Sequence, residues 1–577
     1  PSMNQFDQLD QYMEKKMNQK STIFALLLIL VLPVLASCQT PPPRPTIEPT
    51  LEPEISEEEM TEMDEDEGEE MEETETETEP DPTPTEESMS DSESSETMED
   101  DEMAEAEDGE VEPGSMADVQ ARSGPISDEE AVELMDNLIG RDRDLFLASI
   151  ERILLAEDQR FIAVFLETMR GSQIGVVPFP VETSAIALNR LSGETFGMSW
   201  DSWVSWYGST DLEPPPNFTT WKGQMLSRID PGFGFFLNSD FPTTIRPEEI
   251  QWGGVRVDGI PALDWATMIP ADEAEYLDPG DAVFGLSING DNRAYPLKII
   301  DWHEMANDTV GGVPVSIAYC TLCGAAVAYD GRASDGTTYD FGSSGFLFRS
   351  NKLMYDRQTR TLWNQLTGEP VMGRLVGEDV KLDILPIVLT TWEDWLETHP
   401  DTQVLSVETG WDRPYQTGAA YGDYFSSEGT MFPVYLRSEL LETKEQVYAI
   451  NFEGQPKAYP IPSLTEERVV NDEHAGQPLV LVSAESKIEI EGLSRRSGSV
   501  TYSPGAEVRA YDRQDFEFSI GDNEDQVVDQ NGTVWTVTEE ALLSEDGQSL
   551  ERLPGHLAYW FGWFAFFPNT EVYGIEG

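Results

Sequence analysis

The feature that most restricts how this chain can fold is an internal duplication in its C-terminal part. Residues 283–290 (VFGLSING) resemble residues 447–454 (VYAINFEG), 164 positions later. A common register kept over such a length indicates a repeated structural unit. We therefore predict two similar halves, at about 250–407 and 440–577. Other matches at the offset of 164 are residues 294–296 with 458–460, 307–308 with 471–472, and Gly312 and Pro314 with Gly476 and Pro478; matches at an offset of 168 are Trp392, Trp395, Pro400 and Thr402 with Trp560, Trp563, Pro568 and Thr570.

The two halves differ at the residues best suited to chemistry. His303, Cys320 and Cys323 of the first half have no counterpart, because the second half carries Glu467, Ala484 and Lys487 at these positions. Residues common to both halves are expected to serve the fold. Residues present in one half only are candidates for function, so the candidate site belongs to the first half.

The cysteine pair lies in a C-x-x-C-G turn, residues 320–324, between two strand-like segments. Such a turn is similar to the metal-binding knuckle of rubredoxins and zinc ribbons, where the Gly permits a tight turn and backbone N–H groups point at the sulfurs. A four-cysteine site is excluded because the chain has only 3 Cys. Two thiolates with an imidazole and a thioether suit copper or zinc. The predicted metal ligands are Cys320, Cys323, His303 and Met354, with His399, Glu304 and Asp308 as other candidates for the fourth.

Two other interpretations of the pair stay open at this stage. Outside the cytoplasm, C-x-x-C can form a disulfide, either inert or redox-active. Alternatively, one Cys is a nucleophile with His303 as its base, oriented by Glu304 or Asn307. His399 ends a predicted helix, where a structural role is the commoner one. The residues Trp302, Trp363, Trp392 and Trp395 are expected in the core.

The N-terminal segment is typical of an exported lipoprotein. Lys15, Lys16 and Lys20 precede an apolar run at residues 23–36, which ends in Leu-Ala-Ser-Cys at Cys38. A basic region, a short apolar run and small residues before a cleavage point predict a signal peptide, and the run is too short for a transmembrane helix. The last four residues resemble the bacterial lipobox. We expect residues 1–38 to be an over-extended start followed by a lipoprotein signal, with Met17 as the true start and Cys38 lipidated. This predicts an extracytoplasmic protein anchored to the membrane through Cys38.

A long acidic linker follows. Residues 45–121 contain 34 acidic residues and no Lys or Arg. Residues 39–125 lack the apolar content needed to offset chain entropy, which predicts a disordered stalk. The whole chain has a net charge of -75, and without those 34 charges about -41 remains. Nucleic acid is excluded as a partner by this charge.

The remaining sequence predicts an α+β fold. A small all-helical unit is expected at 126–245, starting with a capping box at Ser127 and Glu130. A β-rich domain made of the two halves is expected at 246–577, with a tight Asn289-Gly290 hairpin turn. Predicted helical segments are 145–156, 160–169, 185–191, 200–207, 223–229 and 391–398; predicted strands are 283–288, 293–300, 313–319, 325–329, 337–341 and 403–406.

Several motifs in one order resemble the DUF3179 family, a domain of unknown function. They include residues 258–262 (DGIPA), 293–296 (RAYP), 319–324 (YCTLCG), 341–345 (FGSSG) and 353–357 (LMYDR). Trp302, His303, Glu304, Asn307 and Asp308 continue the resemblance, which covers about 245–575. Members usually have Pro after the first Cys, where this chain has Thr321.

The resemblance brings no established reaction. We therefore expect a cell-surface lipoprotein of unknown activity, with metal binding or thiol redox chemistry at Cys320, Cys323 and His303. Catalytic candidates are these three residues and Glu304. The opposing hypothesis is a non-catalytic surface binding or scaffold module, in which the cysteines form a structural disulfide.

Overall fold

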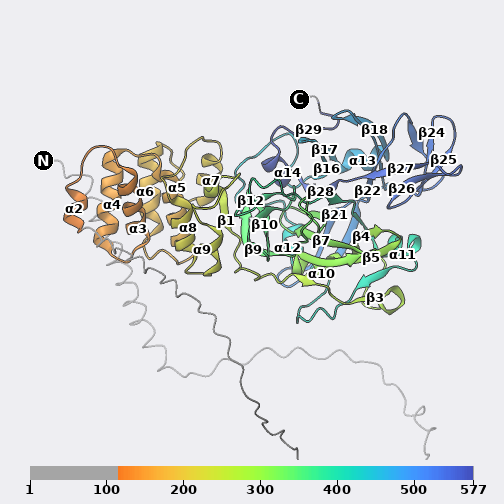
Figure 1. Cartoon of the computed structure of the whole chain (residues 1–577), viewed down its shortest axis with the longest axis horizontal. Helices are drawn as coiled ribbons and strands as arrows, with labels where there is room; N and C mark the ends of the chain where they lie inside the picture. Colours follow the sequence, from red (N-terminus) through yellow and green to blue (C-terminus); the bar gives the residue numbers. More distant parts are fainter. Residues whose placement is uncertain (1–114, 576–577) are drawn as a thin grey trace, which may run out of the picture. The chain divides into compact units, whose positions relative to one another are not determined.

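The computed structural model describes residues 115–575, which form an α+β fold (Figure 1). The predicted signal segment 1–38, its lipidation site Cys38 and residues 39–114 of the predicted linker lie outside the described residues. Helices fill the N-terminal part of the described chain, and strands dominate from β1 (Ile250–Trp252) onward.

The N-terminal part is all helical, as predicted. Its helices are α2 (Met116–Gln120), α3 (Asp128–Ile139), α4 (Arg143–Ala156), α5 (Phe161–Gln173), α6 (Val181–Ser192), α7 (Trp200–Tyr207), α8 (Phe218–Leu226) and α9 (Gly232–Phe236). Helix α2 falls inside the segment predicted to be disordered up to residue 125. The physical reason is local: Ser115 and Asp118 form a capping box, and Val119 is fully buried.

The capping box predicted at the start of α3 is only half formed. The Ser127 hydroxyl accepts the N–H of Glu130 at 3.2 Å, which is the expected cap. The Glu130 carboxylate instead accepts two hydrogen bonds, of 2.7 and 3.1 Å, from the buried Arg152 of α4. Two hydrogen bonds from a buried guanidinium to a carboxylate stabilise the fold more than one hydrogen bond from the Ser127 N–H would. Glu130 therefore binds Arg152 and does not complete the capping box.

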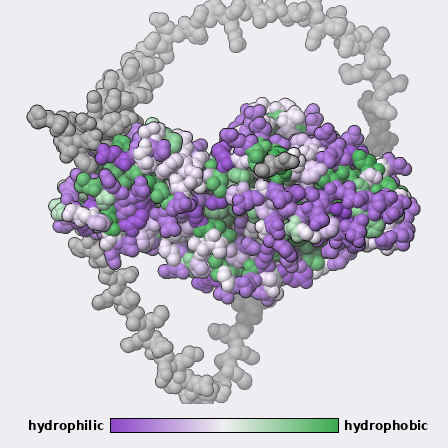
Figure 2. All heavy atoms as spheres, turned by 90° about the horizontal axis from the view of Figure 1, so that it is seen from above, coloured by the Kyte–Doolittle hydropathy of each residue, from purple (hydrophilic) through white to green (hydrophobic). Residues whose placement is uncertain are grey.

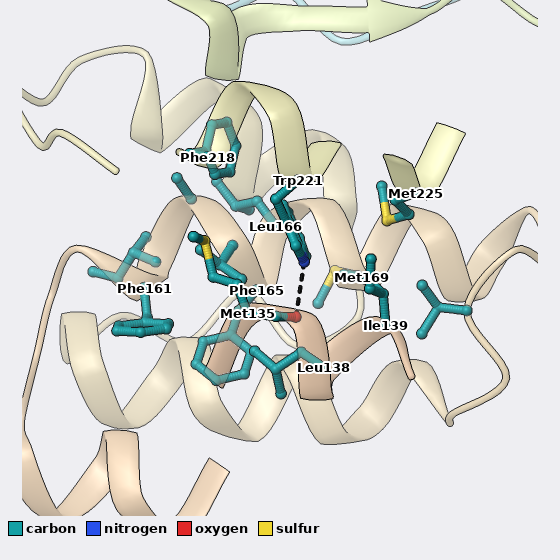
Figure 3. Packing of buried hydrophobic residues seen from close by; sticks show 14 of the residues in the cluster. Met135, Leu138, Ile139, Phe161, Phe165, Leu166, Met169, Phe218, Trp221 and Met225 are labelled. Atoms are coloured by element: carbon teal, nitrogen blue, oxygen red, sulfur yellow. Dashed lines mark hydrogen bonds between the residues drawn. The ribbon is translucent and has the colours of Figure 1, made fainter. Parts of the chain in front are cut away.

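The helices share one hydrophobic core (Figure 3). The side chain of Trp221 from α8 reaches α3, where its indole N–H donates to the Met135 carbonyl oxygen at 2.8 Å. The same core includes Phe346, Phe348 and Leu353 of the β-rich part. The helices and the first β sheet are therefore packed through a common apolar core.

The duplication is visible in matched sheets. In the first half, β14, β4, β5 and β15 are neighbours in this order, and in the second half β28, β16, β17 and β29 are neighbours in the same order. The pairing Val283↔Pro296 recurs as Val447↔Pro460, and the parallel pairing Val404↔Ala294 recurs as Val572↔Ala458. These strands are β4 (Ala282–Ile288), β5 (Asp291–Pro296), β14 (Val388–Thr391), β15 (Gln403–Leu405), β16 (Gln446–Phe452), β17 (Gln455–Pro460), β28 (His556–Tyr559) and β29 (Glu571–Val572).

Side-chain contacts repeat as well. The Tyr295 hydroxyl donates to Asp308 at 2.7 Å, and the Tyr459 hydroxyl donates to Asp472 at 2.8 Å. The indole of Trp395 donates to Thr402 at 2.9 Å, as that of Trp563 does to Thr570 at 2.9 Å. The residues shared by the halves thus serve the fold. The helices that connect the matched strands are α10 (Leu297–His303), α11 (Trp392–Thr398), α13 (Ile461–Glu467) and α14 (Trp560–Phe566).

Further sheets complete each half. In the first half, one has the order β13-β8-β7-β6-β2 and another β1-β9-β10-β11-β12. In the second half, an eight-stranded sheet has the order β18-β19-β22-β27-β26-β25-β24-β23. The bounds are β2 (Leu263–Asp264), β3 (Met268–Pro270), β6 (Met305–Val310), β7 (Val313–Cys320), β8 (Ala325–Asp330), β9 (Phe341–Phe348), β10 (Asn351–Asp356), β11 (Leu362–Asn364), β12 (Pro370–Met372), β13 (Ile384–Leu385), β18 (Val469–His474), β19 (Gln477–Ser483), β22 (Val508–Asp512), β23 (Phe518–Ile520), β24 (Gln526–Asp529), β25 (Val534–Val537), β26 (Ala541–Ser544) and β27 (Ser549–Leu553).

Two predicted strands need correction. The strand predicted at 293–300 ends at Pro296, and α10 begins at Leu297, because a Pro before the first helical residue fits a helix entry and donates no ladder hydrogen bond. The strand predicted at 337–341 is irregular as far as residue 340, apart from an isolated bridge between Thr338 and Arg332, and β9 begins at Phe341. The Asn289-Gly290 turn is as predicted, with positive φ at both residues.

The halves differ most at one connection. In the first half, the C-x-x-C-G turn joins β7 to β8, whereas the second half joins β19 to β22 through residues 484–507. This longer connection contains the hairpin β20 (Ile488–Ser494) and β21 (Gly498–Gly505). Its apolar side chains Ile488, Ile490, Val500 and Tyr502 belong to a core cluster of the first half. The second half therefore contributes a packing element to the first.

The surface of the described part is largely polar. The face shown in Figure 2 is mostly hydrophilic, with hydrophobic side chains in small groups. Within residues 115–575, no helix combines the length and the apolar character that a bilayer crossing requires.

Candidate functional site

The two cysteines lie at a strand end, where the chain turns sharply. Cys320 is the last residue of β7, and β8 begins at Ala325. The turn is closed by a hydrogen bond of 3.1 Å from the Cys323 N–H to the Cys320 carbonyl oxygen, and Gly324 has φ +58°. Both thiols are free and buried, with exposed fractions of 2% and 1%.

The two sulfurs have different electrostatic surroundings. Burial opposes ionisation of Cys320, but hydrogen bonds from the Cys323 side chain and from the backbone N–H groups of Lys352 and Cys323 leave its pKa below the usual thiol value. Burial and the proximity of the Cys320 sulfur raise the pKa of Cys323 well above that value. The Cys323 thiol also lies 3.3 Å from the Ser350 carbonyl oxygen. Cys320 is therefore the sulfur that carries negative charge more readily.

A buried ion pair lies beside this turn. The Lys352 ammonium is 3.2 Å from the Glu304 carboxylate, and the Thr321 hydroxyl donates to the other Glu304 oxygen at 3.0 Å. Glu304 ends α10 in a left-handed conformation, and its carbonyl oxygen accepts the N–H of Tyr319 at 2.8 Å. The matching position in the second half is Arg468, whose carbonyl accepts the N–H of Ser483 at 2.8 Å. Both halves thus contain the same backbone hydrogen bond at this position, whereas only the first half has a carboxylate side chain there.

His303 is held by other partners. Its Nδ1 lies 2.8 Å from the Pro261 carbonyl oxygen, and its Nε2 lies 2.6 Å from the Tyr415 hydroxyl. Burial lowers the pKa of His303, which favours a neutral ring whose Nδ1–H donates to Pro261. Both ring nitrogens are therefore engaged without the cysteines.

The other predicted metal ligands are also dispersed. Met354 lies in a hydrophobic cluster with Phe341 and Trp363, whereas Cys320 and Cys323 belong to a different cluster. Asp308 accepts the Tyr295 hydroxyl in the contact that both halves share. In the part of the chain that the structure describes, no group of three or more His, Cys, Asp or Glu side chains is arranged to hold a metal ion. The residues present do not fit the four-ligand copper or zinc site expected from the sequence.

His399 has the structural role that its position suggested. Its ring stacks on Trp395 with centroids 4.0 Å apart, and its Nδ1 lies 2.8 Å from the Thr398 hydroxyl. In the second half, Phe567 lies against Trp563 in the same way, with centroids 4.3 Å apart. Asn307 is likewise a fold residue, because its side chain binds the backbone of Phe341.

Two tyrosines that sequence reasoning missed cover the thiols. The Tyr424 hydroxyl donates to the Leu322 carbonyl oxygen at 2.6 Å, inside the C-x-x-C turn. Tyr421 is near enough to Glu304 and Cys320 for their charges to act on its pKa, which burial raises above the usual tyrosine value. Both residues lie at α12 (Gly422–Phe425), between the two halves of the sequence, where no periodic pattern marks them.

The second half closes the other side of the turn. The N–H of Tyr559 donates to the Cys323 carbonyl oxygen at 2.7 Å. A Cβ at Gly562 of α14 would lie 3.0 Å from the Cβ and 3.1 Å from the sulfur of Cys323. This close approach needs a glycine, so α14 and the cysteine turn fit each other closely.

The fold and the site define a duplicated α+β protein in which one half carries a buried dithiol and the other half encloses it. Residues 257–570, more than half of the chain, match the family described as "Protein of unknown function (DUF3179)". The chain belongs to this family, as the motifs predicted. No curated protein and no solved structure matches it.

Proposed function

We propose that this chain is a lipid-anchored, extracytoplasmic protein whose Cys320–Cys323 pair works as a dithiol–disulfide redox centre. The observation that supports the proposal is the closed turn that brings two free, buried thiols together, with hydrogen bonds that favour a thiolate at Cys320 over one at Cys323. An extracytoplasmic location, proposed from the lipobox at Cys38, is one where disulfides form and persist.

The exchange would run in two steps. The Cys320 thiolate attacks one sulfur of a partner disulfide, forms a mixed disulfide and releases the partner's other sulfur as a thiolate, which takes up a proton. Cys323 then loses its proton and attacks the Cys320 sulfur, which releases the second partner thiol. In balance, one disulfide and the dithiol give two thiols and the Cys320–Cys323 disulfide.

The surroundings of the pair set two requirements for this chemistry. Both sulfurs are buried, so side chains packed around the turn, Tyr424 among them, must move before a partner disulfide can reach Cys320. Lys352 donates its backbone N–H to Cys320, which stabilises negative charge on the attacking sulfur. The charge of the Glu304 carboxylate, which is paired with the Lys352 ammonium, opposes it.

The test is mixed-disulfide trapping on the full chain carrying Cys38→Ser, incubated with oxidised glutathione. With Cys323→Ser added, Cys320 should hold one glutathione in a stable mixed disulfide, because no second thiol releases it. With Cys320→Ser added instead, the remaining high-pKa thiol should be modified at least ~10-fold more slowly, in line with its lower thiolate fraction. Intact-mass spectrometry measures both.

Three results would overturn the proposal. The first is equal labelling of the two single-cysteine variants at matched pH. The second is stoichiometric copper or zinc in the chain carrying only Cys38→Ser, measured by elemental analysis and lost in Cys320→Ser, which would support the metal hypothesis instead. A pair that stays fully reduced in excess oxidised glutathione would also contradict a redox function.

A further inference from the structure

A cleft of about 510 Å³ lies on the outer side of Tyr421 and Tyr424. Its lining includes Asp301 and Trp302 of α10, Arg413 of the segment between the halves, and Arg495 and Arg496 of the β20–β21 turn. A volume of this size is in the range of small-molecule sites, about 300–1,000 Å³. Trp302 was expected in the core, but its ring is only half-buried at this cleft, while Trp363, Trp392 and Trp395 are buried as expected.

Two guanidinium groups are held at the Trp302 ring. The guanidinium carbon of Arg413 lies 5.8 Å from the ring centroid, and that of Arg495 lies 5.1 Å from it. Within residues 115–575, no carboxylate forms an ion pair with Arg413, Arg495 or Arg496, although acidic residues outnumber basic ones 110 to 35 in the chain. Cation–π contact positions the guanidinium groups and leaves their N–H donors free for a ligand.

The turn that carries Arg495 and Arg496 is fixed in place. The hydroxyls of Ser494 and Ser497 both donate to the Asp423 carboxylate, and the Leu493 N–H donates to the Thr417 carbonyl oxygen at 2.8 Å. The Asp423 carboxylate, which also lines the cleft, is therefore occupied by serine hydroxyls. Preorganised donors lose less entropy when they bind a ligand.

Asp301 gives an independent sign of a ligand. Its exposed fraction is 2%, it lines the cleft, and its Oδ1 has no hydrogen-bond partner in the described part of the chain. Buried polar atoms are nearly always paired, so a lone one in a cleft wall needs a partner from outside. Burial and the nearby Glu304 raise the pKa of Asp301 well above the usual value, which favours the protonated carboxyl, a hydrogen-bond donor.

The cleft belongs to the asymmetric part of the duplication. At the offset of 164, Asp301 and Trp302 fall opposite Thr465 and Glu466. Arg495 and Arg496 come from the hairpin that only the second half contains. The cleft is thus built from residues that the repeat does not require for its fold.

We propose that this cleft binds a small anion with more than one oxyanion group, carboxylate or phosphate, which pairs with Arg413, Arg495 and Arg496 and accepts a hydrogen bond from Asp301. Guanidinium groups suit both oxyanions because their donors form parallel pairs of hydrogen bonds. This site goes beyond the proposed redox function and does not depend on it.

Isothermal titration of the full chain with citrate and with pyrophosphate, at constant ionic strength, tests the site. We expect saturable binding of one molecule per chain to at least one probe. Preference for citrate assigns a carboxylate ligand, and preference for pyrophosphate assigns a phosphate. Acetate has a single oxyanion group and should bind at least ~10-fold more weakly. The loss of one charge-assisted hydrogen bond raises the dissociation constant by a factor of about ten or more.

Matched variants distinguish binding in the cleft from a general effect of the protein's charge on anion binding. Arg413→Gln and Arg495→Gln should each weaken binding ~10-fold or more, whereas Arg374→Gln, at an exposed arginine outside the cleft, should leave it unchanged. Asp301→Asn keeps a donor and should retain binding, and Asp301→Ala should weaken it. The proposal fails if neither probe binds saturably, or if Arg374→Gln lowers the affinity as much as Arg413→Gln does, in variants whose thermal unfolding matches that of the wild type.

Discussion

At the residue scale, the second half contains a buried carboxylate, Glu539, held between the buried Arg552 and the largely buried Arg509. Glu539 accepts a hydrogen bond of 2.7 Å from Arg509 and one of 2.8 Å from Arg552. Burial disfavours the charged form of Glu539, but the two guanidinium groups more than compensate and lower its pKa to about 2. The charged carboxylate therefore stabilises the folded state.

We predict that Glu539→Gln lowers the free energy of unfolding by about 3–5 kcal/mol at pH 7, because it leaves the buried Arg552 without an anion and leaves Arg509 with Glu507 as its remaining partner. The folded pKa lies below the unfolded value near 4.5, so this contribution is complete above that value and is lost as the pH falls towards 2. Urea unfolding from pH 7 to pH 3 should show the two proteins converging at low pH. The control is Glu517→Gln, which removes a pair with Arg513 at an exposed carboxylate, with an expected change below about 1 kcal/mol. Equal stability of Glu539→Gln and wild type at pH 7 would contradict the prediction.

Some residues of the candidate site could be predicted from the sequence, and others could not. Comparison of the halves identified Cys320 and Cys323, because a repeat supplies its own reference. Glu304 was also a predicted candidate, and its counterpart Arg468 shows the same difference between the halves. The comparison could not identify Tyr421, which lies between the halves, or the hydrogen bonds that occupy both nitrogens of His303. Those partners come from Pro261 and Tyr415, and a one-dimensional pattern does not encode contacts over such separations.

At the element scale, the β20–β21 hairpin links the halves through its apolar side chains. Tyr502 has an exposed fraction of 7% and lies in the first half's core cluster, whereas Leu493 of the same hairpin is 59% exposed. The hairpin should therefore stabilise a half to which it does not belong in sequence.

We predict that Tyr502→Ala lowers the free energy of unfolding by roughly 3 kcal/mol, since it removes a large buried ring and leaves a cavity. Leu493→Ala, at an exposed position, should change it by less than about 0.5 kcal/mol. Hydrogen exchange measured by mass spectrometry should show faster exchange in the first-half strands β4 and β7 of the Tyr502 variant. Faster exchange confined to the hairpin would show that it does not support the first half.

Some strands, turns and helices could be predicted from the sequence, whereas others could not. The strand predicted at 283–288 and the Asn289-Gly290 turn that follows it were placed correctly, because alternation and the turn dipeptide are local signals. Helix α10 was missed because its sequence after Pro296 is as apolar as a strand, and packing decides its conformation. The early helix α2 was missed because its cap and its single buried residue, Val119, are too short a pattern to stand out from the acidic segment before it.

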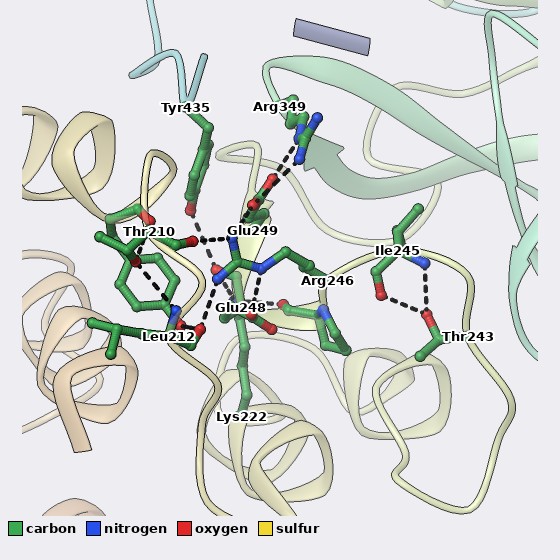
Figure 4. A network of polar contacts seen from close by, with 12 residues as sticks. Thr210, Leu212, Lys222, Thr243, Ile245, Arg246, Glu248, Glu249, Arg349 and Tyr435 are labelled. Atoms are coloured by element: carbon green, nitrogen blue, oxygen red, sulfur yellow. Dashed lines mark hydrogen bonds and ion pairs between the residues drawn. The ribbon is translucent and has the colours of Figure 1, made fainter. Parts of the chain in front are cut away.

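At the scale of the whole molecule, polar contacts join the helices to the β-rich part (Figure 4). Lys222 of α8 is fully buried, and its ammonium lies 2.8 Å from Glu167 and 2.5 Å from the Ile250 carbonyl oxygen of β1. Nearby, Glu249 of the short helix η2 (Pro247–Glu249) accepts from Arg349, which follows β9, at 2.5 Å. Together with the shared apolar core, these contacts should make the helices and the β-rich part unfold as one unit.

We predict a single cooperative transition when the full chain is heated in a calorimeter. Lys222→Met should lower its stability by about 3–5 kcal/mol, because the buried Glu167 loses its cation and three backbone carbonyl oxygens lose a donor. Since Lys222 bridges the two parts, the variant should also show a separate early transition for the helices. The matched control is Lys381→Met, which removes an exposed pair of 2.9 Å with Glu369 and should change stability by less than about 1 kcal/mol. Two transitions in the wild type would mean that the shared core and the Lys222 contacts are too weak to couple the helices to the sheets.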